Sequence, residues 1–255
     1  MVELKTDAEL ALMRAAGRVV ADALAAVRTA VAVGVSLREL DTVAADVIRA
    51  AGATSSFLHY QPHFAPSPYP AMICASVNDV VVHGIPDDYR LRDGDLLSVD
   101  CGAELHGFHG DSAFSMIVGT PSPADEQLVA HTEQALAAGI AATVAGGRLG
   151  DVGHAVGTIG RAAGYGIPAD FGGHGVGRRM HEDPPVYNEG RPGRGLPLRP
   201  GLVIAIEPMF MAGGRDRYRI KPDGWSLCTV DGSRAAHVEH TVAVTEDGPV
   251  VLTAP

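Results

Sequence analysis

The chain has 255 residues, an ordinary globular balance of 46% hydrophobic and 20% charged residues, and a formal net charge of −10. This size and composition exclude a disordered chain and fit one large domain or two small ones. The negative charge argues against nucleic acid as a partner, because phosphate binding needs a concentrated basic surface.

The first fifty residues predict two helices. Apolar residues recur at three- and four-residue steps over residues 7–33, and Gly34 is expected to end this helix. Ser36 and Glu39 form a capping box that opens a second helix, which is expected to end near Gly52.

A loop, three strands and two more helices are expected next. The loop covers residues 57–70, because its four prolines forbid regular strand pairing. Ser122 is the expected N-cap of the third helix, with Pro123 at its first position. The expected strands are residues 72–82, 96–101 and 111–118, and the expected helices are residues 123–145 and about 150–163. Beyond Gly166 the expected strands are residues 202–206, 218–220, 226–230 and 241–244.

A faint internal repeat relates two parts of the chain. Residues 93–100 and 200–207 each contain a turn glycine, a short apolar strand and a carboxylate six residues after the glycine. A second carboxylate, Asp111 or Glu239, then opens another strand, and two helices precede each strand pair. This order predicts an α+β fold with duplicated halves, in which helices cover a mixed or antiparallel sheet.

The four acids of this repeat suggest a metal site. Asp100 and Glu207 each end an apolar strand, where a buried carboxylate is costly unless it is paired or bound to metal. For either residue alone, a solvated strand end is the alternative. Two more acids nearby would add repulsion, which a divalent cation removes. Four carboxylates with one imidazole form a hard site, which favours a dinuclear hydrolytic centre over a structural metal.

The stretch GGHGVGRRMHEDP at residues 172–184 could be a phosphate loop, part of a metal site or a flexible turn. Its glycines miss the spacing of a dinucleotide-binding loop, and no nucleophile elbow or HExxH motif occurs in the chain. The three cysteines, Cys74, Cys101 and Cys228, are too widely spaced for a zinc ribbon, and a disulfide framework is not expected.

The N-terminus is charged and has no continuous apolar core, so no signal peptide is expected. No apolar run approaches the ~20 residues of a membrane-spanning helix. We therefore expect a soluble cytoplasmic protein.

Five residues in order, with their surroundings, resemble the metal ligands of the pita-bread metallopeptidases. The local contexts are VDCGAELHGFHGDSAFS, GGHGVGRRMHEDP, IAIEPMF and HVEHTV, and the residues are Asp100, Asp111, His174, Glu207 and Glu239. Within that superfamily, SVNDVVVHGIPDD is similar to the segment typical of type I methionine aminopeptidases. The resemblance spans about residues 5–253. It implies a single catalytic domain over residues 1–255, with a curved, mainly antiparallel sheet in pseudo-two-fold halves.

The resemblance also implies a role for each of the five residues. Asp100 would chelate one of two divalent metals, and Asp111 and Glu239 would bridge both. His174 and Glu207 would complete the coordination of the other metal. A hydroxide bridging the metals would be the nucleophile, and Glu207 would shuttle its proton. Co²⁺, Mn²⁺, Fe²⁺, Zn²⁺ and Ni²⁺ are the candidate ions.

Two further histidines and a pocket complete the implied site. His83 would bond the scissile nitrogen, and His181 would donate to the substrate carbonyl and stabilise the developing oxyanion. The free amine of the substrate would approach the metal near Asp100. The expected lining of an apolar pocket for the first side chain is Tyr60, Tyr69, Cys74, Phe108, Phe171 and Trp225.

Two features depart from the usual family pattern. An aromatic residue usually precedes the second histidine of the glycine-rich stretch, where this chain has Met180. Residues 57–73 form a longer and more proline-rich segment than the usual type I form. Both features are expected to border the substrate pocket.

The leading hypothesis is a hydrolase that removes the initiator methionine from nascent chains with a small second residue. Its partners would be nascent polypeptide N-termini at the ribosome, and a monomer without membrane or nucleic acid binding is expected. An Xaa-Pro peptidase is the first alternative, but such enzymes usually carry a large N-terminal domain, for which the residues before Asp100 leave no room. A binding module that has lost its metals is the second alternative, but all five ligand positions are filled.

Overall fold

The computed structural model describes residues 2–62 and 65–254, so residues 63 and 64 of the expected proline-rich loop lie outside the described part. Helices cover four segments of the described chain, as expected from the sequence. They are α1 (Asp7–Ala30), α2 (Leu37–Ala50), α3 (Pro123–Ala141) and α4 (Leu149–Ala162).

The sequence signals at the helix starts are confirmed. The Ser36 hydroxyl accepts from the Glu39 backbone N–H, and the Glu39 carboxylate accepts in return from the Ser36 backbone. The Ser122 hydroxyl caps α3 by accepting from the Asp125 backbone N–H, and Pro123 occupies the first helical position. The first helix also begins with a capping box, which Thr6 forms with Glu9.

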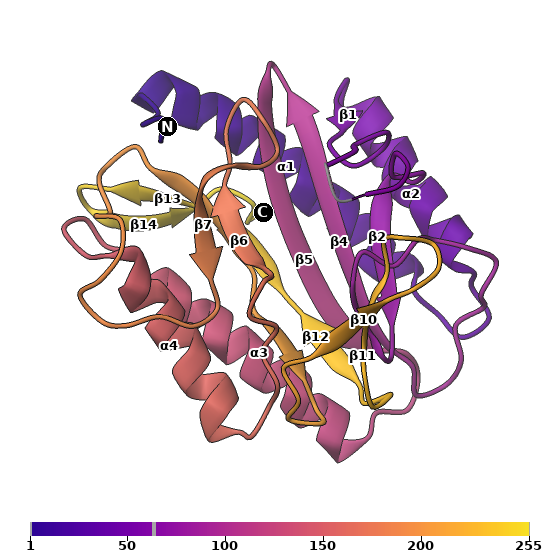
Figure 1. The fold of residues 1–255 in the computed structure, drawn as a ribbon. Helices are drawn as coiled ribbons and strands as arrows, with labels where there is room; N and C mark the ends of the chain where they lie inside the picture. The colour runs from indigo at the N-terminus through magenta and orange to yellow at the C-terminus, as the bar shows by residue number, and fades with distance from the viewer. Residues whose placement is uncertain (1, 63–64, 255) are drawn as a thin grey trace.

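The main sheet has nine strands in the described chain, and its pairs are antiparallel. Its path runs β1-β4-β5-β13-β8-β6-β7, while β2 pairs with β4 and β14 pairs with β13 (Figure 1). The strands are β1 (Thr54–Ser55), β2 (Ile73–Val77), β4 (Leu96–Leu105), β5 (Phe108–Ile117), β6 (Gly172–Gly175), β7 (Glu182–Tyr187), β8 (Val203–Ile206), β13 (Glu239–Thr245) and β14 (Gly248–Val251).

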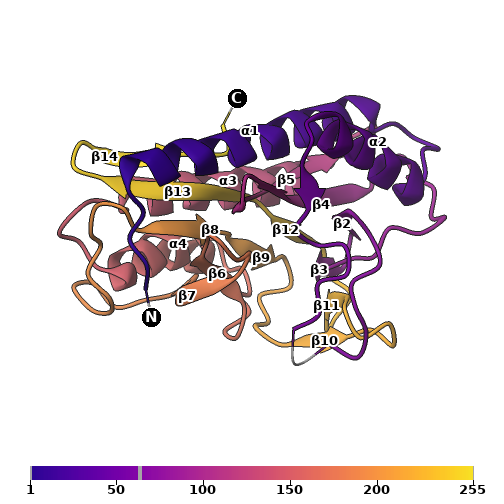
Figure 2. The same cartoon turned by 90° about the horizontal axis from the view of Figure 1, so that it is seen from above.

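Two small sheets lie beside the main one. The first has the order β10-β11-β3, and the second pairs β12 with β9. Their strands are β3 (Val80–Val82), β9 (Met209–Met211), β10 (Tyr218–Ile220), β11 (Leu227–Thr229) and β12 (Ala235–His237). In Figure 2, β10 and β11 lie on the opposite side of β4 and β5 from α1 and α2.

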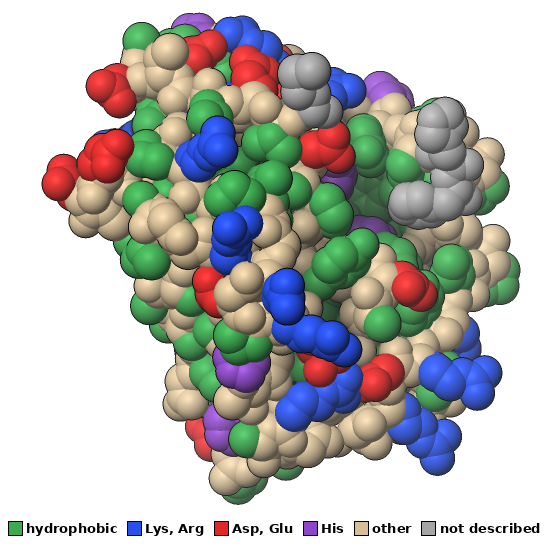
Figure 3. All heavy atoms as spheres, turned by 60° about the vertical axis from the view of Figure 1, so that its left-hand side comes forward, with side chains coloured by type: hydrophobic (Ala, Val, Ile, Leu, Met, Phe, Trp, Pro, Cys, Tyr) green, Lys and Arg blue, Asp and Glu red, His purple; other side chains and the backbone are tan. Residues whose placement is uncertain are grey.

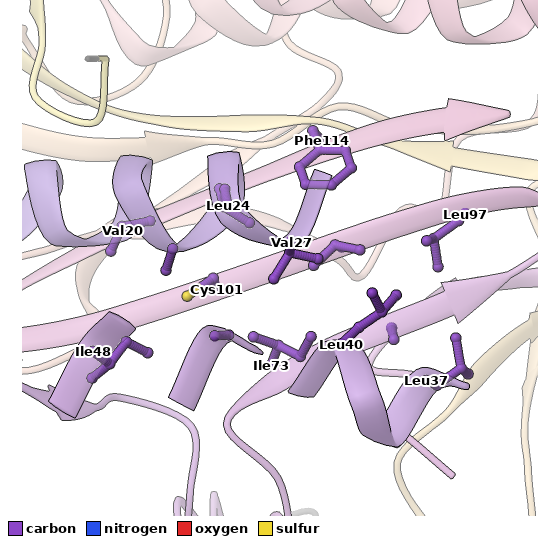
Figure 4. Close-up of a cluster of buried hydrophobic side chains, with 14 of the residues drawn as sticks. Val20, Leu24, Val27, Leu37, Leu40, Ile48, Ile73, Leu97, Cys101 and Phe114 are labelled. Carbon is purple, nitrogen blue, oxygen red and sulfur yellow. The ribbon is translucent and has the colours of Figure 1, made fainter. Parts of the chain in front are cut away.

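Each pair of helices packs on its own part of the sheet. Side chains of α1 and α2 form one core with Leu97 and Cys101 of β4, Ile73 of β2 and Phe114 of β5 (Figure 4). A second core joins α3 and α4 to β8 and β13. Because β5 pairs with β13, the two halves suggested by the sequence repeat meet along that ladder.

Several strand predictions were wrong, and β1, β9, β12 and β14 were not predicted. The strand expected over residues 72–82 is broken into β2 and β3, because Asn78 turns the chain with a φ of 59°. The strands around Asp100 and Asp111 are longer than expected and form a tight hairpin, in which Asp111 is internal to β5 rather than at its start. The strands β6 and β7 in the glycine-rich stretch were not predicted, because that stretch has no alternating apolar pattern.

Candidate active site

Strand register brings three of the predicted acids together. Asp100 of β4 lies opposite Ala113 of β5, and Ala113 lies opposite Glu239 of β13. Paired residues of adjacent strands share a face, and residues two apart on one strand share it too, so Asp111 joins the same row. The small residue Ala113 lies between Asp100 and Glu239 in this row.

The fourth acid, Glu207, enters the row from the end of β8. Glu207 directly follows Ile206, whose partner on β13 is His240, the neighbour of Glu239. Pro208 follows Glu207 and ends the ladder, as the sequence predicted. The Asn188 side-chain amide donates to the Glu207 carbonyl at 2.9 Å, which holds the backbone at this point.

The glycine-rich stretch forms the hairpin of β6 and β7 and places His174 beside the acids. A Cβ atom at Gly173 would lie 2.0 Å from the Ala205 carbonyl oxygen, and one at Gly175 would lie 2.2 Å from the Asp183 carbonyl oxygen. Only glycine permits this close approach of backbones. His174 Nε2 lies 3.5 Å from Asp111 Oδ2 and 3.7 Å from Glu207 Oε1.

His181 returns to the same place from the turn between β6 and β7. Its ring centroid lies 4.1 Å from that of His174 and 5.0 Å from that of Tyr60, with which it is stacked. The two histidines of the glycine-rich stretch are therefore neighbours in space.

His83 directly follows β3 and has a φ of 60°, which is uncommon for a residue other than glycine. Its ring packs edge-on against Phe171 at 5.8 Å and Trp225 at 6.3 Å between centroids. Its Nδ1 atom is buried without a hydrogen-bond partner among the described residues. A strained backbone and an unpaired buried nitrogen are typical of a functional position.

One cavity of about 250 Å³ collects all ten predicted site residues. Figure 3 shows the surface hollowed between hydrophobic side chains, with histidine visible in its depth. The predicted residues in its lining are Tyr69, Cys74, His83, Asp100, Asp111, His174, His181, Glu207, Trp225 and Glu239. Tyr60, Phe171 and Met180 also line it, as expected.

The expectation that Phe108 lines the pocket was wrong. Phe108 packs with Met13 and Val176 in a separate buried cluster, under the guanidinium of Arg178. Side chains alternate along β5, so Phe108 points to the opposite face from Asp111.

Burial and like charges act together on the acids. Burial, and then the charges of Asp111 and Glu207, raise the pKa of Asp100 well above its ordinary value. Burial, and then the same neighbouring acids, raise the pKa of Glu239 well above its ordinary value. Burial would also raise the pKa of Glu207, but contact with His237 and the charge of His174 lower it below its ordinary value.

His83 and His181 are held neutral. Burial lowers the pKa of His83 to about 4, against a smaller opposing effect of Glu207. Burial, with the neighbouring imidazoles of His174 and His83, lowers the pKa of His181 to about 2. Near pH 7 both rings are uncharged and each still carries one N–H donor.

Buried polar atoms without partners indicate, independently of the charge of the acids, that the site fits a metal ion. Six buried side-chain N or O atoms have no hydrogen-bond partner within the described residues, and five of them belong to this region. The five are His83 Nδ1, Asp100 Oδ1, Asp111 Oδ1, His237 Nε2 and Glu239 Oε1. Unpaired buried carboxylate oxygens are costly, and metal coordination satisfies them. Two triads, one of Asp111, His174 and Glu239 and one of Glu207, His237 and Glu239, could each hold an ion.

Phe57 lines the cavity, as expected for the segment of residues 57–73. One residue near the acids was missed by the sequence reasoning. His237 had no expected role, yet its Nε2 lies 3.5 Å from Glu207 Oε2. The available signal was its position two residues before Glu239, which is the spacing of same-face neighbours in extended chain.

A match to a protein-family model identifies the family of this chain. The model of metallopeptidase family M24 matches residues 11–246. The chain belongs to metallopeptidase family M24. It is a metal-dependent hydrolase, and the side chains gathered in the cavity are of the kinds that bind divalent metal.

Within family M24, the similar curated proteins span the whole chain. A protein of Mycobacterium tuberculosis named methionine aminopeptidase 1 is 53% identical, over 99% of this chain and 95% of its own. A methionine aminopeptidase of Clostridium perfringens is 42% identical, over 99% of both chains.

Two of the similar solved structures differ in how much of their own chain is matched. The methionine aminopeptidase of Thermotoga maritima has a TM-score of 0.95 and 39% identity, and the match covers 100% of both chains. The prolidase of Pyrococcus furiosus has a TM-score of 0.77 and 22% identity, and this chain covers only 65% of it. The second likeness concerns the fold alone. These matches confirm the expected pita-bread fold. Among the described residues, no helix is both long and apolar enough to cross a membrane.

Proposed function

We propose that the chain is a methionine aminopeptidase that removes the N-terminal methionine from newly made polypeptides with a small second residue. Residues 1–255 act as one catalytic domain, as a monomer in the cytoplasm, on chains emerging at the ribosome. The convergence of all ten predicted site residues on one cavity carries this proposal. The full-length likeness to proteins named methionine aminopeptidase supports it.

Five side chains hold the metals in this proposal: Asp100, Asp111, His174, Glu207 and Glu239. Their oxygen-rich set suits two divalent cations from the group Co²⁺, Mn²⁺, Fe²⁺, Zn²⁺ and Ni²⁺. The bound cations supply an activated water at neutral pH and polarise the scissile carbonyl. Burial, and then repulsion among the acids, raise the pKa values of Asp100 and Glu239, and bound cations would offset both effects.

Glu207 is the proposed proton acceptor. Its pKa lies below the ordinary value, so it is a carboxylate near neutral pH and can accept a proton. It lines the cavity beside Asp111 and His174, where the attacking water must lie. Passing that proton to the leaving nitrogen completes the hydrolysis.

The two neutral histidines are proposed to hold the peptide bond. His181 donates its N–H to the substrate carbonyl and stabilises the negative charge that develops on that oxygen. Its stacking on Tyr60 fixes the ring without adding a charge. His83, with its unpaired buried Nδ1, is placed to bond the scissile nitrogen.

The apolar end of the cavity is the proposed methionine pocket. The Tyr69 hydroxyl donates to the carbonyls of Ile73 and Gly84, which fixes its ring as a wall. The Trp225 ring packs edge-on against it at 5.0 Å between centroids. A volume of about 250 Å³ admits one terminal residue but no folded segment, which favours an exopeptidase.

Peptide hydrolysis after metal replacement tests this function. Purified protein is stripped with a chelator, reloaded with Co²⁺ or Mn²⁺ and given Met-Ala-Ser, with Leu-Ala-Ser as the matched control. We expect methionine release only in the reloaded protein and little release of leucine. Absence of metal-dependent methionine release would contradict the proposal.

Xaa-Pro dipeptides in the same assay test the first alternative. If these are cleaved and Met-Ala-Ser is not, the chain is an Xaa-Pro peptidase. If the stripped protein takes up no divalent ion in a metal analysis, the chain is a binding module of the same fold.

A further inference from the structure

The buried imidazole of His237 is absent from the proposed ligand set, although it faces two of its members. Its Nε2 lies 3.5 Å from Glu207 Oε2 and 3.8 Å from Glu239 Oε2. The residue is only 2% exposed. A polar ring so deeply buried is costly unless it has a specific partner.

The backbone of His237 is fixed against the hairpin that carries Asp100 and Asp111. Its N–H donates to Ser115 Oγ at 3.0 Å, and its carbonyl accepts from the same hydroxyl at 2.8 Å. Ser98 lies opposite Ser115 in the hairpin, and their hydroxyls are 2.7 Å apart. These bonds hold the end of β12 against β4 and β5 and so fix the position of the His237 imidazole.

The carboxylate of Glu207 lies between two imidazoles. Its Oε1 atom faces His174 Nε2 at 3.7 Å, and its Oε2 atom faces His237 Nε2 at 3.5 Å. A group on each oxygen restricts rotation of the carboxylate plane. His237 Nε2 has no hydrogen-bond partner within the described residues, so its donor is available to Glu207. A hydrogen bond of this kind would orient a metal ligand and strengthen metal binding.

His174 and His237 differ in the hydrogen bonding of Nδ1, the ring nitrogen that does not face Glu207. His174 has a partner for Nδ1, the Gly175 carbonyl oxygen at 2.9 Å. Metal-ligating histidines usually have such a partner on the ring nitrogen away from the metal. Within the described chain, the His237 ring makes no side-chain hydrogen bond of this kind, which favours a donor to Glu207 over a ligand.

We infer that His237 is a positioning residue, which donates its Nε2–H to Glu207 and fixes the orientation in which that carboxylate meets the metal. This inference rests on the ligand set of the proposed function. It adds a sixth side chain that controls metal affinity without touching substrate.

Substitution of His237 tests the inference through metal binding, without any peptidase assay. The stripped variants His237→Ala and His237→Gln are titrated with Co²⁺ by calorimetry. The matched control is His240→Gln, because His240 bonds Ser112 and Thr253 instead of the acids. Loss of the donor in His237→Ala should weaken Co²⁺ binding about 10–100-fold. His237→Gln keeps an N–H donor and should restore most of the affinity, while the control binds as the parent does.

The visible absorption of bound Co²⁺ separates positioning from ligation. If His237 is no ligand, His237→Gln should leave the band position unchanged. A band shift, together with an affinity in His237→Gln as low as in His237→Ala, would identify a direct ligand and overturn the inference. Parent-like affinity in His237→Ala would overturn it as well. Thermal melts of the stripped variants show which ones fold, and none of these readouts depends on methionine release.

Discussion

At the scale of single residues, burial shifts the pKa values of the acids and of the histidines in this site in opposite directions. Burial raises the pKa of Asp100 and Glu239 but lowers that of His83 and His181. The acids therefore resist ionisation until a cation is bound, whereas the histidines stay neutral throughout. Neutral rings suit the roles proposed for His83 and His181, which are to donate hydrogen bonds to a peptide without repelling the metals by a positive charge.

Replacing His181 tests the proposed oxyanion contact. His181→Ala should lower kcat about 10²–10³-fold with little change in metal affinity, because one donor to the developing oxyanion is lost. Steady-state kinetics on Met-Ala-Ser and a Co²⁺ titration measure the two effects. His109→Ala is the control, since His109 bonds Ser56 and does not line the cavity. An equal loss of rate in both variants would argue against the contact.

Replacing Asp100 tests the electrostatic cost of the metal-free site. Asp100→Asn removes one buried acid from a repelling group, so the stripped protein should melt higher, by roughly 2–4 °C for each kcal/mol relieved. The same variant should bind Co²⁺ more weakly. Asp125→Asn should instead lower the melting temperature, because Asp125 pairs with Arg234 at 3.2 Å. Calorimetric melts with and without Co²⁺ measure both effects. A melting temperature of stripped Asp100→Asn below that of the stripped parent would contradict the proposed repulsion.

At the scale of elements, the ladder between β5 and β13 fixes the geometry of the acids. Thr241 on β13 supplies a link beyond the backbone pairing, because its hydroxyl accepts from the Asp111 N–H at 3.0 Å and donates to the Asp111 carbonyl at 2.8 Å. Thr241 is fully buried. Both backbone groups of a proposed ligand thus depend on one side chain of the neighbouring strand.

Replacing Thr241 tests this link. Thr241→Val keeps the shape but leaves two buried backbone groups unpaired, so the free energy of unfolding should fall by about 1–3 kcal/mol. Metal affinity should fall with it, because Asp111 loses its support. Thr245→Val, on the same strand, breaks a hydroxyl contact with Gly248 far from the acids. Urea unfolding and Co²⁺ titration should show an affinity loss in the first variant only, and a loss in both would contradict the link.

At the scale of the whole molecule, the sequence predicted what depends on local pattern. The Ser36 capping box, the Ser122 cap and the four helices follow from spacing, and the five proposed ligand positions follow from the family resemblance. It could not place Phe108, because the direction of that side chain depends on where the β4–β5 hairpin turns. It also missed His237, because its neighbour Glu207 is thirty residues away in the chain and comes close only through strand pairing.

The measurement that tests the central claim most directly is anomalous X-ray diffraction from crystals of the protein loaded with Mn²⁺. The claim is that one cavity holds metal between the two halves of the fold. We expect two anomalous peaks about 3.5–4 Å apart, in contact with Asp100, Asp111, His174, Glu207 and Glu239. Saturating Mn²⁺ with no peak at these residues, or with peaks only elsewhere, would contradict the account.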